Sequence, residues 1–188
     1  MLEKINDINP DDNLPESYYY FMGLSDVQNS ILDSITKNPG IRYRELLRST
    51  GLSNGGLTYH LKILEKMTRL SITRQKKATR YFPIDTPTQE ALIIPHLRIR
   101  SQREIIFFLL KHDLCTFNEI VEHLKKAPST ISWHLKRLCE DSILLVQNGE
   151  YHLYRLPNKE FVKQTVYKYK ESLTDNIIDD FIDMANEL

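Results

Sequence analysis

The sequence predicts a mainly α-helical protein with small β-hairpins, in which one compact unit occurs twice. Residues 57–64 and 131–138 share the order apolar, hydroxyl, aromatic, His, Leu, Lys, any residue, Leu, and they lie 74 positions apart. Shifting the sequence on itself by 74 positions aligns 25–83 with 99–157 without a gap, and both segments end in proline. Apolar positions coincide far more widely than identical residues do. We interpret this register as a tandem duplication of one small domain.

Composition narrows the class of protein. The chain has 188 residues, of which 41% are apolar and 27% charged, as in an ordinary soluble protein with one or two domains. Its apolar runs are too short to span a bilayer, and its first residues lack a signal-peptide pattern. Two cysteines, Cys115 and Cys139, make neither a disulfide framework nor a four-ligand metal site. We expect a reduced, cytoplasmic protein without a metal or other cofactor.

Charge is unevenly distributed along a chain that is neutral overall. Residues 25–83 carry a net charge of +7, whereas the second copy, 99–157, carries only +1. An acidic, aromatic N-terminal arm at 1–24 carries −4, a linker at 84–98 carries −1, and the C-terminal segment 158–188 carries −3. A basic first copy beside a nearly neutral twin indicates a polyanionic partner for the first copy.

The first copy shows start and stop signals for three helices. Ser25 is a good N-cap for a helix that the Asn-Pro-Gly run at 38–40 ends. A short extended piece and a second helix follow, and Gly51 suits the left-handed position after that helix. Ser53 then caps a third helix, whose leucines recur at helical spacing. Alternation over 70–74, turn residues and a return over 80–83 predict a β-hairpin. This order of elements describes a winged helix-turn-helix domain.

The second copy repeats the pattern. Helices are expected over 105–111 and 117–125, and Pro128 suits the first turn of the third helix because its missing N–H costs nothing there. The segments 144–147 and 150–156 form the hairpin, and Asn148-Gly149 predicts a two-residue turn between them.

The two flanking segments carry apolar residues of their own. In 84–98, Pro87 and Pro95 argue against one long helix, and an apolar run between them suggests a tether that packs. Apolar residues at helical spacing through 158–188 predict an amphipathic helix, with a break near Thr174. We expect this helix either to pack on the preceding domain or to pair with its copy in a homodimer.

The helix-turn-helix segments 38–61 and 129–138 resemble those of predicted transcriptional regulators with two winged helix-turn-helix domains, a group typical of archaea. More broadly, both resemble ArsR- and MarR-type helices. The resemblance covers 25–157 and implies sequence-specific DNA binding by a repressor or an activator. The cysteine-rich box of metal-sensing ArsR proteins is absent from both second helices, so their metal response is not implied.

In the first copy, the N-terminal part of the third helix is expected to meet base edges in the major groove of double-stranded DNA. Two glycines there weaken the helix but permit a close approach of the backbone. Cations in or beside the wing, and two ahead of the second helix, are expected to contact phosphates. The candidate DNA-binding residues of this copy are Ser53, Asn54, Gly55, Thr58, Tyr59, Lys62, Arg74, Lys76, Lys77, Arg80, Arg42 and Arg44.

The second copy has fewer cations, and its predicted turn carries one carboxylate and no positive charge. Two interpretations stay open: it contacts DNA weakly through its third helix, or it has become an interaction or sensor domain. We expect Trp133 to be partly exposed. Its candidate DNA-binding residues are Ser129, Thr130, Ser132, Trp133, Lys136 and Arg137.

No set of residues indicates catalysis. His60 and His134 each lie alone beside apolar residues, without partners at metal-ligand spacing, and packing is the simpler interpretation. The favoured function is a sequence-specific transcription regulator that binds double-stranded DNA as a dimer through the C-terminal helix. The alternatives are a monomer whose two copies imitate a dimer, and a protein-interaction adaptor without base readout.

Overall fold

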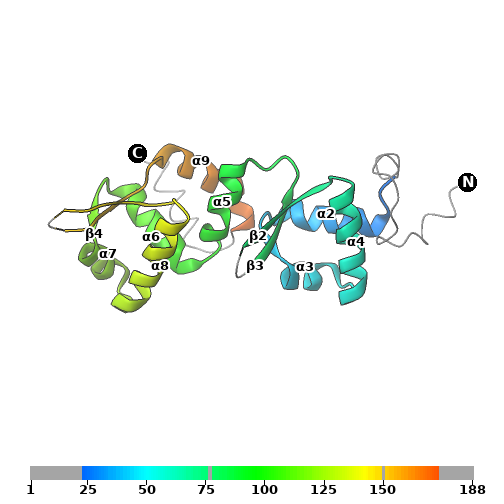
Figure 1. Ribbon diagram of the computed structural model, residues 1–188, viewed down its shortest axis with the longest axis horizontal. Helices are drawn as coiled ribbons and strands as arrows, with labels where there is room; N and C mark the ends of the chain where they lie inside the picture. The colour runs from blue at the N-terminus through cyan, green and yellow to red at the C-terminus, as the bar shows by residue number, and fades with distance from the viewer. Residues whose placement is uncertain (1–22, 76–77, 150, 174–188) are drawn as a thin grey trace, which may run out of the picture. The chain divides into compact units, whose positions relative to one another are not determined.

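The computed structural model describes residues 23–75, 78–149 and 151–173, and they divide into two units, 1–86 and 87–188 (Figure 1). We call these the first and second domains and describe each by itself. In the described part of the chain, no helix is long and apolar enough to cross a membrane.

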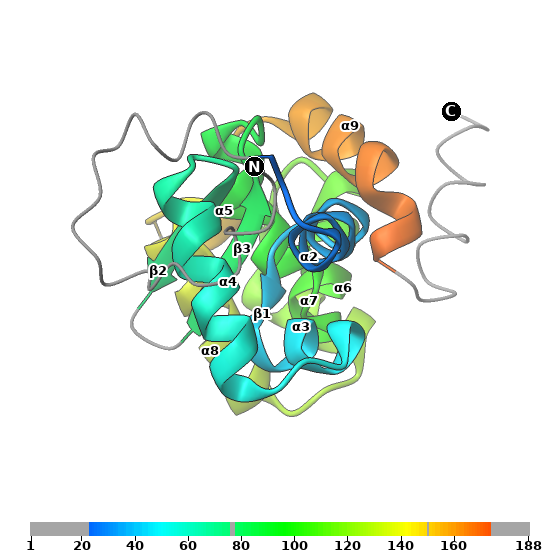
Figure 2. The same ribbon diagram turned by 90° about the vertical axis from the view of Figure 1, so that its right-hand side faces the viewer.

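In its described residues, the first domain has three helices and a three-stranded antiparallel sheet (Figure 2). The strand order is β1-β3-β2. Its elements are α2 (Asp26–Lys37), β1 (Ile41–Arg42), α3 (Tyr43–Thr50), α4 (Asn54–Lys66), β2 (Leu70–Gln75) and β3 (Ala78–Pro83).

The predicted helix ends of the first domain are confirmed. The Ser25 hydroxyl accepts a hydrogen bond from the Gln28 N–H at 3.3 Å, and the Gln28 side chain accepts one from the Ser25 N–H at 2.9 Å. Gly51 follows α3 in the left-handed conformation, with φ 67°. The hairpin strands are longer than expected, because Gln75 pairs with Ala78 and leaves only 76–77, outside the described residues, between them.

The first core lies where the inner faces of the three helices meet the sheet. Apolar residues at i, i+4 and i+7 of α4 point into it, because that spacing places them on one side of a helix. Its buried members are Ile31, Ile35, Ile41, Leu46, Leu57, Leu61, Leu64, Leu70 and Tyr81.

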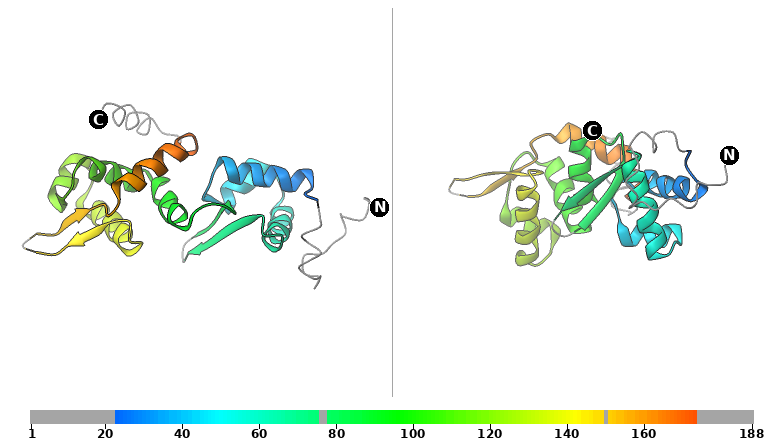
Figure 3. Two further views of the ribbon diagram at one scale, coloured as in Figure 1. Left: turned by 90° about the horizontal axis from the view of Figure 1, so that it is seen from above. Right: turned by 45° about the vertical axis from the view of Figure 1, so that its right-hand side comes forward.

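The second domain repeats this architecture and adds a helix at each end; its hairpin extends away from its own helices (Figure 3). Its sheet order, β4-β6-β5, corresponds to that of the first domain. Its elements are α5 (Thr88–Leu97), α6 (Arg100–Lys111), β4 (Cys115–Thr116), α7 (Phe117–Leu124), α8 (Pro128–Glu140), β5 (Leu145–Gln147), β6 (Leu153–Arg155), α9 (Lys159–Tyr169) and a short 3-10 helix (Lys170–Ser172).

Two local predictions in the second domain were wrong. Its first helix begins at Arg100, five residues earlier than expected. Its hairpin does not use a two-residue turn, because Gln147 pairs with Leu153 and five residues lie between them. Within that connection, the His152 ring lies 2.9 Å from the Asn148 side-chain oxygen, so the asparagine closes a wider loop.

The segment 84–98, expected as a packing tether, holds the helix α5. Pro87 is its N-cap, and Pro95 lies inside the helix, two residues before its end, where it leaves the carbonyl four residues earlier without its usual N–H donor. Ile93 and Leu97 of α5 belong to the second core. The tether therefore packs against the second domain.

The described part of the C-terminal segment packs on its own domain. Val162 and Val166 of α9 and Leu173 after it are at most 4% exposed and belong to the second core. On the polar side of α9, the Lys168 ammonium lies 2.9 Å from the Glu90 carboxylate of α5. Residues 174–188, the remainder of the predicted helix, lie outside the described residues, as do 1–22 of the N-terminal arm.

Candidate nucleic-acid interface

The third helix of the first domain, α4, presents a polar face opposite its buried leucines. Ser53 begins this helix, and its hydroxyl accepts a hydrogen bond from the Gly56 N–H at 3.1 Å. The predicted DNA-facing side chains lie on the solvent side because the leucines occupy the other side. The exposed residues of this face are Ser53, Asn54, Gly55, Thr58 and Lys62.

A hydroxyl from the preceding helix organises the first turn of α4. The Tyr43 oxygen lies 2.8 Å from the Asn54 side-chain oxygen, 2.9 Å from the Asn54 carbonyl and 2.9 Å from the Thr58 hydroxyl. Sequence reasoning missed Tyr43, because nothing local relates it to residues 11 and 15 positions later. The repeat contained one signal: position 117 of the second copy is phenylalanine, which has no hydroxyl.

Cations lie on the elements that flank α4. Arg42 and Arg44, at the start of α3, are exposed as expected. The backbone N–H of Arg42 donates to the Glu45 carboxylate at 3.0 Å. Arg74 of β2 is paired with Glu65 at 2.7 Å, with 63% of its side chain exposed. That hydrogen bond raises the pKa of Arg74 above its usual value. Part of this arginine's charge is therefore offset within the domain, while the group itself stays at the surface.

Arg80 does not fit its expected role as a DNA contact. It is 4% exposed, and its guanidinium donates to the Gly40 carbonyl at 2.8 Å. β1 and β3 pair at Arg42 and Arg80, which places Arg80 beside the turn that contains Gly40. The Arg80 guanidinium therefore makes its contact inside the domain and leaves little surface for a phosphate.

Tyr59 is less exposed than the other candidates on α4. It packs against Ile63 and Met67. Its ring is edge-on to the His60 ring, with 5.1 Å between the two ring centres. Lys76 and Lys77, the predicted tip of the wing, lie outside the described residues.

The corresponding face of the second domain is exposed but carries less charge. Trp133 of α8 is 49% exposed, as expected for a partly exposed residue, and the Arg137 guanidinium lies 5.5 Å from its ring centre. Lys136 lies 3.9 Å from Glu140. The exposed candidates on this face are Ser129, Thr130, Ser132, Trp133 and Lys136.

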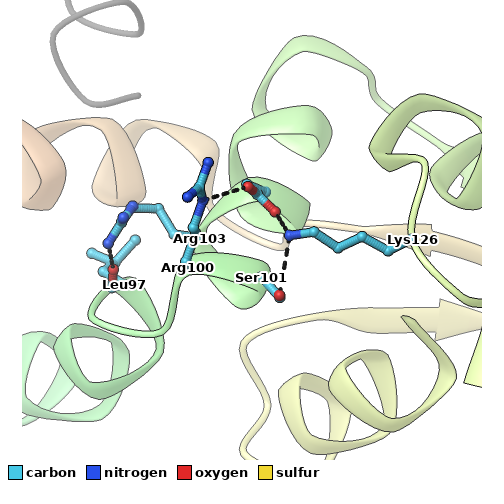
Figure 4. A network of polar contacts seen from close by, with 6 residues as sticks. Leu97, Arg100, Ser101, Arg103 and Lys126 are labelled. Carbon is cyan, nitrogen blue, oxygen red and sulfur yellow. Dashed lines mark hydrogen bonds and ion pairs between the residues drawn. The ribbon is translucent and has the colours of Figure 1, made fainter. Parts of the chain in front are cut away.

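Lys126, just before α8, is turned into its own domain (Figure 4). Its ammonium contacts the Glu104 carboxylate and donates to the Ser101 hydroxyl at 3.1 Å, and Arg100 lies 3.1 Å from the same carboxylate. Burial, followed by repulsion from Arg100, lowers the pKa of Lys126. The second domain thus uses one of its few cations internally, in addition to Arg103, which is 4% exposed and donates to the Leu97 carbonyl at 2.6 Å.

The wing of the second domain is apolar where that of the first is basic. Leu145 and Val146 on β5 are each 40% exposed, and Tyr151 beyond β5 is 66% exposed. β5 is also the edge strand of its sheet. This surface has less electrostatic attraction for DNA than the first wing.

His60 and His134, one in each domain, and both cysteines of the second domain lie in packed surroundings. Burial lowers the pKa values of His60 and His134, and it raises the pKa values of the Cys115 and Cys139 thiols. Among the residues that the structure describes, no group of three or more His, Cys, Asp or Glu side chains is arranged to hold a metal ion.

Comparison with known proteins agrees with this arrangement. A family model described as an N-terminal HTH domain matches residues 25–92, and one described as bacterial regulatory protein, arsR family, matches residues 100–143. The fold and these matches define a protein with tandem winged helix-turn-helix domains.

A curated relative points to the same class. Over 156 residues, which is 80% of this chain, the sequence is 29% identical to an uncharacterized HTH-type transcriptional regulator of Methanocaldococcus jannaschii. The match covers 35% of that relative, so the chain spans about a third of its length. Over its tandem domains, the chain is thus similar to part of a protein named as an HTH-type transcriptional regulator.

Proposed function

We propose that this protein is a sequence-specific transcription regulator whose first domain supplies most of its binding to double-stranded DNA. The observation that carries this proposal is the exposed polar face of α4, flanked by Arg42, Arg44 and Arg74 on a domain with a net charge of +7.

In this proposal, the N-terminal half of α4 enters the major groove. Asn54 and Thr58 contact base edges, because amide and hydroxyl groups match the donors and acceptors displayed there. Arg42 and Arg44 contact phosphates and fix the orientation of α4 on the duplex. Gly55 adds close contact: a Cβ built at this position would have no neighbour within 4 Å, so the backbone is open to an approaching partner.

The second domain contributes a weaker and less electrostatic contact. Ser129, Thr130 and Ser132 face solvent on α8, but Lys126 and Arg103 are engaged inside the domain. Trp133 can contact a thymine methyl group, which is an apolar feature of the major groove.

We further propose a homodimer formed through the C-terminal segment beyond Leu173. The apolar face of α9 is occupied by its own domain, so the pairing residues are the apolar ones that continue the helical spacing, Ile177, Phe181, Met184 and Leu188. A twofold dimer would bind a site with two equivalent halves.

The test is affinity selection from a random double-stranded DNA pool, followed by titration of the enriched sequence at several salt concentrations. A recovered motif supports the regulator, and its symmetry distinguishes a dimer from a monomer with two unlike domains. Binding without enrichment, with a steep salt dependence, would contradict sequence-specific readout.

A second candidate function is supported by the apolar surface of the second domain. Apolar side chains are exposed on the wing, at Leu145, Val146 and Tyr151, and on α8, at Trp133. A DNA-binding domain would gain more from cations at these positions. In this alternative, the chain is an adaptor that binds another protein. Absence of DNA binding even at low salt would favour it.

A further inference from the structure

We propose that Tyr43 is a positioning residue for base readout: its hydroxyl orients the Asn54 amide so that the NH2 group faces the major groove and donates to a guanine. This inference rests on the proposed function. Under it, the first turn of α4 selects guanine, and Tyr43, a residue outside that helix, determines the choice.

The hydrogen-bond geometry defines the orientation of the amide. A hydroxyl has a single proton to donate, and the Tyr43 oxygen has three neighbours within 2.9 Å. The Thr58 hydroxyl donates to the Asn54 carbonyl at 2.9 Å. We assign the Tyr43 proton to its shortest contact, the Asn54 side-chain oxygen at 2.8 Å, where it holds this oxygen toward α3. The N–H of the amide that is anti to this oxygen consequently points away from Tyr43, on an exposed side chain.

This orientation matches one base better than the others. In the major groove, guanine displays two adjacent acceptors, N7 and O6, whereas adenine displays the N7 acceptor beside an N6 donor. An amide whose oxygen is engaged presents only a donor, which either guanine acceptor can take and which the N6 donor of adenine opposes. A freely rotating asparagine can present its oxygen and nitrogen together, which is the pairing that adenine accepts. Removing the Tyr43 hydroxyl should therefore relax the choice between these two purines.

The second domain shows that the fold does not need this hydroxyl. Tyr43 begins α3 and packs against the first core, and Phe117, 74 positions later, begins α7 and packs against the second core. Where the first copy has Asn54, the second has Pro128, which carries no amide to orient. Tyr43→Phe thus reproduces an arrangement that the chain already uses, and it deletes only the hydrogen bonds at α4.

The experiment is affinity selection with the full chain and with its Tyr43→Phe variant, followed by fluorescence anisotropy on the selected site and on its guanine-to-adenine replacements. The position read by Asn54 is the one whose preference disappears in Asn54→Ala. There we expect the native protein to prefer guanine by about tenfold and Tyr43→Phe by less than threefold, within the usual size of such contacts. In the Asn54→Ala background, Tyr43→Phe should have no further effect.

Tyr154→Phe serves as the matched control, because it removes a hydroxyl from a partly buried tyrosine in the second domain. Both hydroxyl deletions should leave the melting temperature unchanged within about 2 °C. A guanine preference that survives in Tyr43→Phe would overturn this inference and leave the proposed function standing. An adenine at the Asn54-dependent position, or a destabilised Tyr43→Phe, would also overturn it. Failure of the native protein to enrich any motif would overturn the proposed function and this inference with it.

Discussion

The Arg80 guanidinium donates to the carbonyl of Gly40 at 2.8 Å, although the two residues lie 40 positions apart in the chain. Gly40 has a φ of 75°, and its N–H donates to the Tyr81 carbonyl at 2.9 Å. The turn before β1 is thereby attached to β3 from both sides. An arginine that the sequence places beside a basic wing belongs, in the folded domain, to the framework.

We expect Arg80→Ala to lower the free energy of unfolding of the first domain by about 2 kcal/mol, because a hydrogen bond from a charged donor and a buried side chain are lost together. Urea denaturation followed by circular dichroism measures this change. At temperatures where the variant is folded, the salt dependence of its DNA affinity should match that of the native protein. If the variant kept the native stability but its DNA affinity depended less on salt, Arg80 would contact a phosphate after all.

Arg44→Ala and Arg42→Ala should show the opposite pattern. Both side chains are exposed, so each variant should keep its stability, weaken binding to all DNA sequences alike and reduce the salt slope by about 0.9 per lost phosphate contact. Lys37→Ala on α2, which removes one exposed charge from the same domain, is the control. Equal effects of Lys37→Ala and Arg44→Ala would mean that only net charge matters and that no specific phosphate contact exists.

Gly55→Ala should separate stability from function in α4. A Cβ at this position meets no atom within 4 Å, and alanine favours the helix, so the free energy of unfolding should rise by about 0.5 kcal/mol. The added methyl group stands on the face proposed to meet DNA, so affinity should fall severalfold. Asn29→Ala, at an exposed position of α2, should stabilise without weakening binding. An unchanged DNA affinity in Gly55→Ala would show that this face is not in close contact.

Acid should destabilise the second domain through His134. Burial, then the charges of Lys126 and Arg137, lowers the pKa of His134 in the folded state. Below about pH 6.5, the unfolded chain therefore takes up the proton first. The contribution of this histidine is fully present above that pH and is lost as pH falls toward the lower pKa of the folded state.

The variant His134→Phe cannot titrate at this position, and the decrease in the free energy of unfolding between pH 7.5 and 5.5 should become smaller. Part of the decrease should remain, because burial also lowers the pKa of His123 in the same domain. Urea denaturation at three pH values measures the slope. If the free energy of unfolding of His134→Phe changed with pH as steeply as that of the native protein, protonation of His134 would not oppose folding.

Removal of residues 174–188 should dissociate the proposed homodimer. The shortened chain, 1–173, keeps Val162, Val166 and Leu173 in the second core, so both domains should stay folded. Light scattering should give twice the monomer mass of 22.2 kDa for the full chain, and the mass of one monomer for the shortened one. Equal association states of the two chains would reject this interface.

The duplicated architecture can be predicted from the residues alone, because the signals for it are local or periodic. Leu57, Leu61 and Leu64 are buried, as are Ile131, Leu135 and Leu138 at the matching positions, since a helix places such spacings on one face whatever the rest of the chain does. Ser25, Gly51 and Pro128 were predicted for the same reason: a helix end depends on neighbouring residues.

Which polar residues stay exposed to a partner depends on contacts between segments that are distant in the chain. In the sequence, Arg80 and Lys126 are basic residues like Arg44. In the folded domains, Arg80 is bound by a carbonyl 40 positions away, and Lys126 by a carboxylate 22 positions away. Tyr43 gained its role in the same way, from Asn54 and Thr58 on the next helix. The energy of a charge or hydroxyl depends on the few groups within hydrogen-bond reach of it, and chain folding, not local spacing, selects those groups.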